Sequence, residues 1–255
     1  MPSRERSRRV DALILRHTRW GEADRLLTVF TRELGKVRVV AKGVRKIKSR
    51  KAGHLEPFMH TALQLAQGRD WWIVTQAEVI EPFSELRTDL QKTGYASYVI
   101  ELLDRFTYED GPNQPLYRLA LETLLRLAKG DPLFVVIRYY EVCVLDLMGF
   151  RPQLFNCLIC AEEIQAVDQY FSVMQGGILC PKCAHKGEDA RRISVQALKY
   201  MRHFQRSSYQ KALVAQPDEK TKEELAAILQ WYLTFLLERE INSNTFIREI
   251  GKGYQ

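Results

Sequence analysis

The sequence has no apolar run long enough to cross a lipid bilayer. A membrane-spanning helix needs about 18–20 consecutive apolar residues, and no uncharged stretch of this chain reaches that length. The apolar run at residues 12–15, which follows an Arg-rich start, is too short for the core of a signal peptide. We therefore predict a cytoplasmic protein with no membrane partner. In that compartment the five cysteines are expected to be thiolates or metal ligands and not disulfides.

Motifs of the common enzyme classes are missing too. No Gly-x-x-x-x-Gly-Lys-Ser/Thr run is present to cradle nucleotide phosphates, and neither His-Glu-x-x-His nor Gly-x-Ser-x-Gly occurs. Glu22 and Asp24 share a predicted loop, but two acids without a third do not make the metal site of a nuclease. We therefore expect a binding protein and not an enzyme.

Acidic residues are absent from residues 34–55. Residues 1–82 carry 17 Lys or Arg and 9 Asp or Glu, a net charge of +8, whereas the rest of the chain carries 21 and 22, a net charge of −1. A dense block of one sign repels itself, so it indicates a polyanionic partner: a phosphate polymer first, an anionic membrane surface second. The alternative is a solvated basic face without a partner. The block contains Lys36, Arg38, Lys42, Arg45, Lys46, Lys48, Arg50 and Lys51.

Apolar residues alternate with a period of two over the first 80 residues or so, which predicts strands. The turn signals Trp20-Gly21, Leu34-Gly35, Lys42-Gly43 and Gly68-Arg69-Asp70 separate them. Five short strands, with the longest connection between the third and the fourth, are typical of a small closed barrel of the OB type. An open five-stranded sheet is the alternative. The predicted strands are residues 10–15, 26–30, 36–41, 62–66 and 71–79.

After Pro82 the apolar period becomes that of a helix. In Gly130-Asp131-Pro132, Asp131 is the predicted N-cap of the third helix and Pro132 its first-turn residue. Thr221 and Glu224 have the spacing of a capping box at the start of the last helix. The predicted helices are residues 86–106, residues 116–127, a third ending at Met148-Gly149, a fourth opening near Ser194, and residues 221–241.

Four cysteines form two Cys-x2-Cys pairs separated by 19 residues: Cys157, Cys160, Cys180 and Cys183. Two such pairs on a hairpin can place four thiolates about 2.3 Å from one Zn²⁺ ion. Residues 169–173, 175–177 and 178–179 predict the strand, turn and returning strand of that hairpin. Because protein ligands fill all four positions, we expect one structural Zn²⁺ per chain and no catalytic metal.

The alternatives for these cysteines are four reduced structural thiols or redox pairs of the thioredoxin type, which would need a strand-to-helix context. His185 lies close enough in the sequence to replace one ligand. Cys143, within an apolar helical run, is expected to pack in the core.

Aromatic residues of the basic part of the chain offer faces on which nucleic-acid bases could stack. They are Trp20, Phe58, Trp71 and Trp72. Adjacent Trp71 and Trp72 would point to opposite faces if they shared a strand. Core packing is the alternative for each of them.

Several segments carry a family resemblance. Residues 21–31 read Gly-Glu-Ala-Asp-Arg-Leu-Leu-Thr-Val-Phe-Thr, and Val40-Ala41-Lys42-Gly43-Val44-Arg45 is followed by Lys48-Ser49-Arg50 and Leu55-Glu56-Pro57-Phe58. Further on, Leu147-Met148-Gly149-Phe150-Arg151-Pro152 leads into Cys157. In this order, over essentially the full length, the chain resembles the RecO family of bacterial recombination-mediator proteins. Ala161 departs from the family, in which a glycine is frequent at this place.

The resemblance implies a multi-domain α+β protein: an OB-fold, then a helical domain that a zinc module interrupts. The corresponding ranges are 1–82, 83–150, 151–192 and 193–255. Proteins of this family bind single- and double-stranded DNA and anneal complementary strands. With RecR, and in some bacteria RecF, they load RecA onto DNA coated by single-strand-binding protein, whose acidic C-terminal tail docks on the helical domain. The resemblance thus implies DNA repair at the nucleoid, with Lys42, Arg45, Lys46, Lys48 and Arg50 in the family's basic loop.

Two further functions agree with the same residues. The first is an adaptor whose helical body docks partner proteins while the barrel makes only weak contact with DNA. The second is an RNA-binding protein, because OB barrels and zinc ribbons also bind RNA.

Overall fold

The computed structural model describes residues 7–109, 111–238, 243 and 247. The chain forms two compact units, Met1–Lys129 with Asn242–Gln255, and Gly130–Ile241. The division at residues 82, 150 and 192 that the sequence suggests is a different one and stays a prediction.

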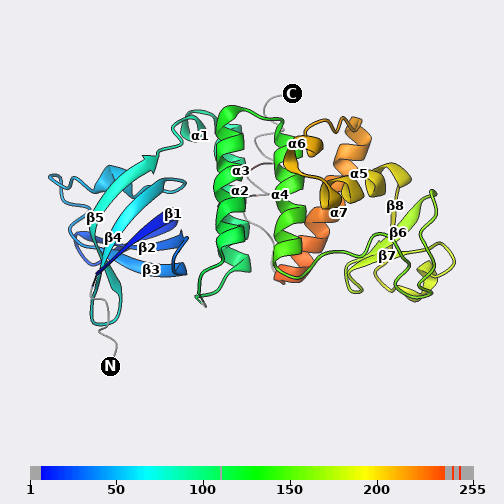
Figure 1. Cartoon of the computed structure of the whole chain (residues 1–255), viewed down its shortest axis with the longest axis horizontal. Coiled ribbons are helices and arrows are strands. Elements are labelled where there is room, and N and C mark those ends of the chain that lie inside the picture. Colours follow the sequence, from blue (N-terminus) through cyan, green and yellow to red (C-terminus); the bar gives the residue numbers. More distant parts are fainter. Residues whose placement is uncertain (1–6, 110, 239–242, 244–246, 248–255) are drawn as a thin grey trace. The chain divides into compact units, whose positions relative to one another are not determined.

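The first unit begins with a closed five-stranded barrel (Figure 1). The strand order is β1-β2-β3-β5-β4, and the β3–β5 pair that closes the barrel is parallel. This confirms the five predicted strands and the OB-type barrel, and it excludes the open sheet. The strands are β1 (Ser7–Trp20), β2 (Asp24–Thr31), β3 (Gly35–Ala41), β4 (His60–Gln67) and β5 (Trp72–Glu81).

Strand β1 is long enough to pair with two neighbouring strands along different parts of its length. Its first half pairs with β4 and its second half with β2, and the register shifts between Ile14 and Arg16. Alternate residues such as Val10, Ala12 and Ile14 point into the barrel core. The sequence predicted only residues 10–15 as strand because the polar residues beyond them are largely exposed and give no hydrophobic alternation.

Along residues 83–129, as far as they are described, three helices follow the barrel: α1 (Glu85–Thr88), α2 (Leu90–Phe106) and α3 (Gln114–Lys129). The single helix predicted over residues 86–106 is wrong at one point, because Asp89 has extended backbone angles and separates α1 from α2. Its carboxylate accepts a hydrogen bond from the backbone N–H of Lys92, as an N-cap residue does. Aspartate favours N-caps over helix interiors, but the apolar period continues across Asp89, so the periodic pattern concealed the break.

The barrel is attached to these helices by polar contacts. The Lys36 ammonium donates to the carbonyl of Thr107 and lies 2.6 Å from a carboxylate oxygen of Asp104. Gly35 approaches the backbone so closely that a Cβ would lie 1.8 Å from the Gly111 oxygen. His60 of β4 and the Tyr117 hydroxyl of α3 are 2.9 Å apart.

Acid is expected to weaken this first unit through His60. Burial lowers the pKa of this imidazole from 6.5, so the folded state takes up the proton at a lower pH than the unfolded chain, which does so below about pH 6.5. Stability should therefore fall as the pH decreases through that value, by up to about 1.4 kcal/mol per pH unit. Urea unfolding between about pH 5 and 8 tests this. The slope should flatten in His60→Gln and persist in the exposed control His185→Gln; an unchanged slope in His60→Gln would contradict it.

The second unit contains helices and a small sheet (Figure 1). The helices α4 and α5 and the hairpin β6–β7 agree with the predicted elements. Strand β8, which pairs with β6, is too short to show a period in the sequence. The elements are α4 (Leu133–Leu147), β6 (Gln169–Ser172), β7 (Gly177–Leu179), β8 (Arg191–Ile193), α5 (Val195–Arg206), α6 (Tyr209–Ala212) and α7 (Glu219–Leu237).

Two predicted helix starts are wrong. Helix α4 has Pro132 as its N-cap, and Asp131 instead accepts a hydrogen bond from the Tyr209 hydroxyl at 2.7 Å. Helix α7 begins at Glu219 and is capped by Asp218, whose carboxylate accepts from the N–H of Thr221.

The predicted partner in the capping box, Glu224, binds elsewhere. Its two carboxylate oxygens accept from the backbone N–H and the hydroxyl of Ser194, each at 2.6 Å. Glu224 therefore ties α7 to the start of α5. Residues 239–241 of the last predicted helix lie outside the described residues. In the described parts of the chain, no helix is both long and apolar enough to cross a bilayer.

Candidate functional site

The basic loop, defined as residues 42–51, leaves β3 and leads into the short 3-10 helix η1 (Ala52–His54). Its first turn is held by β2 and the residue before it. Asp24 accepts from the backbone N–H of Gly43 at 2.7 Å, and the carbonyl of Ala23 accepts from the N–H of Arg45 at 2.9 Å. The Val44 side chain is 1% exposed and belongs to the barrel core. The backbone of the loop is thus held by the barrel, while all of its charged side chains except Lys51 are exposed.

A second anchor lies just after the loop. Glu56 accepts from Arg25 at 2.8 Å and lies 3.1 Å from the His17 ring nitrogen. Partial burial acts to raise the pKa of this carboxyl, but the bonds from Arg25 and His17 outweigh it and lower the pKa below its usual value. Sequence reasoning missed this role of Glu56 and that of Asp24, although both belong to the segments that carried the family resemblance.

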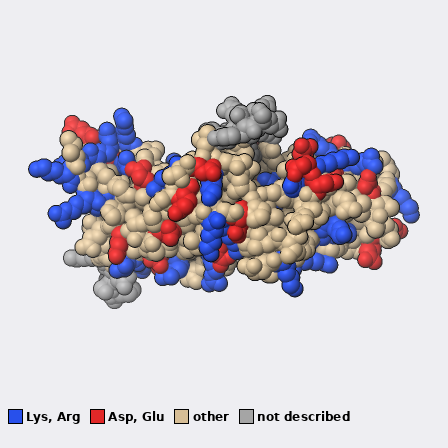
Figure 2. Space-filling view, turned by 90° about the horizontal axis from the view of Figure 1, so that it is seen from above, with Lys and Arg blue, Asp and Glu red and all other residues tan. Residues whose placement is uncertain are grey.

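Five of the eight predicted cations project from the loop with their charges available. No described carboxylate lies within ion-pair distance of any of them; Arg45 bonds only to backbone carbonyls, among them that of Glu22 at 3.0 Å. Lys and Arg side chains gather at the barrel end of the first unit in Figure 2. The five are Lys42, Arg45, Lys46, Lys48 and Arg50, all exposed.

The other three predicted cations have partners inside the first unit. Lys36, with a side chain only 15% exposed, is bound to the C-terminal end of α2. Arg38 forms an ion pair with Glu109 at 2.7 Å. Lys51 donates to the carbonyl of Val74. The structure therefore does not bring these three together with the five exposed cations of the loop.

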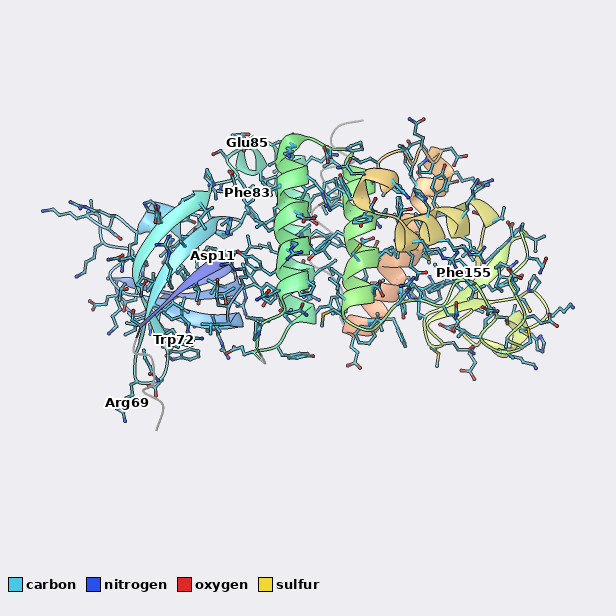
Figure 3. All side chains as sticks on the ribbon, in the orientation of Figure 1. Asp11, Arg69, Trp72, Phe83, Glu85 and Phe155 are labelled. Carbon is cyan, nitrogen blue, oxygen red and sulfur yellow. The ribbon has the colours of Figure 1, made fainter. Side chains whose placement is uncertain are left out.

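The predicted stacking aromatics differ in their surroundings. Trp72 begins β5 and packs against the barrel core (Figure 3). Trp71 precedes the strand, so the two tryptophans do not share it as predicted, and the Arg38 guanidinium lies 5.0 Å from the Trp71 ring. Phe58 is buried, whereas Trp20 is 46% exposed. Of the four, Trp20 offers the most accessible face.

The four paired cysteines come together in the second unit. Their sulfur atoms, from Cys157, Cys160, Cys180 and Cys183, all lie within 4.8 Å of one another. The sulfur atoms of Cys160 and Cys180 are 3.8 Å apart, which matches the edge of about 3.8 Å of a tetrahedron with metal–sulfur bonds of about 2.3 Å. The cluster therefore has the dimensions of a four-thiolate metal site. Among the described residues, His185 and Cys143 are not part of it.

Backbone N–H groups stabilise a negative charge on the sulfur of Cys157 in this cluster. Burial acts to raise the pKa of the Cys157 thiol, but N–H groups of Cys160, Cys180 and Ile159 outweigh it and lower the pKa to about 6. Burial and the neighbouring thiols raise the pKa of Cys183 to about 12. Without a cation, the sulfur atoms thus resist carrying several negative charges at once. A bound metal ion removes that repulsion.

Ala161, where the family frequently has a glycine, has a strained backbone conformation next to the first Cys-x2-Cys pair. This alanine has a φ of +61°, in the left-handed region where a side chain costs about 1–2 kcal/mol. Glycine loses more chain entropy on folding, so Ala161→Gly should stabilise the protein by only about 0.5–1 kcal/mol. Urea unfolding measures this. The control is Ala166→Gly, at an exposed alanine without a positive φ, where the change should not stabilise. Equal effects at both positions would contradict strain at Ala161.

The protein thus combines a closed OB-type barrel, which carries a cationic loop, with a separate unit that carries a four-cysteine cluster. Two family models match: Recombination protein O N terminal over residues 6–83 and Recombination protein O C terminal over residues 87–245. A DNA repair protein RecO from Roseiflexus sp. (strain RS-1) is 40% identical, covering 97% of this chain and 87% of that protein. Another from Desulforamulus reducens is 36% identical, covering 96% and 95%. This chain therefore belongs to the recombination protein O (RecO) family.

Proposed function

We propose that this chain is a non-enzymatic mediator of DNA repair and recombination that binds single- and double-stranded DNA and anneals complementary strands. One observation carries the proposal: five exposed cations without a described carboxylate partner project from a loop whose backbone is held by Asp24. In this proposal residues 1–82 are the DNA-binding part of the protein.

The chemistry of the loop suits the phosphate backbone rather than the bases. Lys and Arg neutralise phosphates and release counterions, which gives affinity without reading the sequence. Annealing makes and breaks no covalent bond. A cationic surface reduces the repulsion between two strands and leaves their bases free to pair.

The proposed partners follow from the family. The relatives are named for DNA repair, and the family resemblance adds RecR, the C-terminal tail of single-strand-binding protein and, indirectly, RecF and RecA. The chain would then act at the nucleoid in the cytoplasm, helping to load RecA onto coated DNA.

The four-cysteine cluster supports a structural Zn²⁺, one per chain. Four thiolates in a tetrahedron are a preferred ligand set of Zn²⁺, and no position remains for a reacting water. When bound, the ion would hold the two Cys-x2-Cys turns of the module at residues 151–192 together. Cys157, Cys160, Cys180 and Cys183 would be its ligands.

A salt titration of the wild-type protein tests the proposal. If about five phosphates of a single strand are contacted, the slope of log affinity against log salt concentration should be roughly −3.5. Annealing of complementary strands should be accelerated in the same range of salt. Two results would overturn the proposal: DNA binding that is weak and independent of salt, which would favour the adaptor, or preferential binding of structured RNA at matched salt.

A further inference from the structure

A cavity of about 430 Å³ lies beside the cysteine cluster in the second unit. Cys180 contributes to its wall, so a bound metal would brace one side of it. The other residues on which the inference depends are Glu162, Glu163, Val167, Gln169, Pro181 and Lys182.

Gln169 is a buried polar residue, and one of its side-chain atoms has no hydrogen-bond partner. Its side-chain NH2 group donates to the carbonyls of Gln165 and Val167, at 3.0 and 2.8 Å. This fixes the orientation of the amide, because the reverse orientation would place its oxygen against two carbonyl oxygens. The residue is 1% exposed, and its Oε1 has no hydrogen-bond partner. A buried carbonyl without a donor is rare in native proteins and calls for a partner.

The remaining walls combine negative charge with apolar surface. Glu162 and Glu163 are both exposed, and no described cation lies within ion-pair distance of either. Lys182 supplies one positive charge against these two carboxylates, so the cavity is net negative. Val167 is 52% exposed, and Pro181, also exposed, lines the same cavity.

We propose that this cavity binds the side chain of a lysine from a partner protein. An ammonium group has three donors on a flexible four-carbon stem. The two exposed glutamate carboxylates on the wall can accept from it, and Gln169, whose buried Oε1 has no partner, lines the same cavity. Val167 and Pro181 provide the apolar surface along which such a stem packs. Oε1 is shielded from bulk water, so a bond to it requires a small movement of the wall.

Lysine fits the cavity better than arginine because the acceptors belong to separate side chains. The planar guanidinium fork is matched to the two oxygens of a single carboxylate. Glu162 and Glu163 line the cavity with two separate carboxylates, which suit a compact charge on a flexible stem better than a rigid fork. The inference does not depend on DNA binding by the basic loop, so the failure of one does not imply the failure of the other.

Titration of the full-length, metal-loaded chain with the capped peptide acetyl-Gly-Lys-Gly-amide tests the proposal. NMR should show shifts of the Val167 amide and of the Gln169 side-chain NH2 group. The same peptide with an acetylated lysine keeps the stem but loses the charge, and it should bind at least about tenfold more weakly. The variants Glu162→Gln and Glu163→Gln should each weaken binding severalfold. The matched control is Glu188→Gln, an exposed glutamate of the same unit that does not line the cavity, and its binding should not change.

Each alternative result has a defined meaning. Equal binding of the acetylated peptide would show that the cavity recognises only an apolar stem. Tighter binding of an arginine peptide would overturn the choice of lysine. An absence of shifts at Val167 and Gln169, with the fold of the variants intact by circular dichroism, would overturn the site as a whole.

Discussion

Replacing Lys42, Arg45, Lys46 and Lys48 together by alanine is expected to weaken binding of single-stranded DNA by roughly 10²–10³-fold at about 0.1 M salt. Each phosphate contact on a single strand contributes about 0.7 to the salt slope, which is about fivefold in affinity at that concentration. Loss of four contacts out of about five should reduce the slope from roughly −3.5 to roughly −0.7. The loss should be the same for every DNA sequence, because phosphates carry no base information.

The fold of the loop should survive this change. Its turn is held by backbone groups: Asp24 accepts from the N–H of Gly43, and Ala23 accepts from that of Arg45. Val44, which packs into the barrel core, is not altered. Loss of binding in this variant would therefore report the charges and not a collapsed loop.

The matched control removes the same number of charges from exposed lysines of the second unit. These are Lys186, Lys199, Lys211 and Lys220. Fluorescence anisotropy over a salt series, with an annealing assay in parallel, measures both variants. The proposed interface would be wrong if the loop variant kept the wild-type slope, or if the control lost as much affinity as the loop variant.

Removal of the metal is expected to produce the largest loss of stability. The strands of the small sheet in the second unit have only four, three and three residues, so the sheet contributes few backbone hydrogen bonds of its own to stability. A structural zinc supplies a further constraint, and its binding free energy contributes to folding. We expect a strong chelator or Cys157→Ser to lower the melting temperature by roughly 10 °C or more.

Elemental analysis of protein purified without added metal should find about one zinc per chain. Cys143→Ser is the matched control, because Cys143 lies on α4 outside the cluster. DNA binding by Cys157→Ser should keep its dependence on salt wherever the barrel remains folded, because the basic loop belongs to the other unit. A native protein that is free of metal and equally stable would refute the site.

Local patterns predicted most of the elements. The period-two alternation of the first 80 residues indicated the barrel because its inward-facing residues, such as Leu27 and Val29, are apolar. The two cysteine pairs indicated the cluster because their spacing within each pair is itself the geometry of a ligand turn. Both signals are carried by residues close together in the sequence.

Helix starts were predicted less well because several residues compete for one cap. Asp131 and Pro132 both suit the start of α4, and Asp218 and Thr221 both suit that of α7. Which of the two residues becomes the N-cap depends on where the helix packs. Asp131 is bound by Tyr209, and Glu224 is bound by Ser194, which lies 30 residues before it. Partners so distant leave no trace in a local pattern.

The sequence by itself determined the type of most elements, the gathering of positive charge in the first part of the chain, and which four cysteines form the cluster. Only the tertiary structure decided which charges remain available. Lys36 is paired with Asp104, 68 residues later, and Arg38 with Glu109, 71 residues later, and Lys51 donates to the Val74 carbonyl, while the other five cations of the block stay exposed. The tertiary structure alone also placed Gln169 in the lining of a cavity and left its Oε1 without a hydrogen-bond partner. The physical reason is that periodicity and ligand spacing act between near neighbours, whereas the partner of a charge or a hydrogen bond is set by segments that meet only when the chain folds.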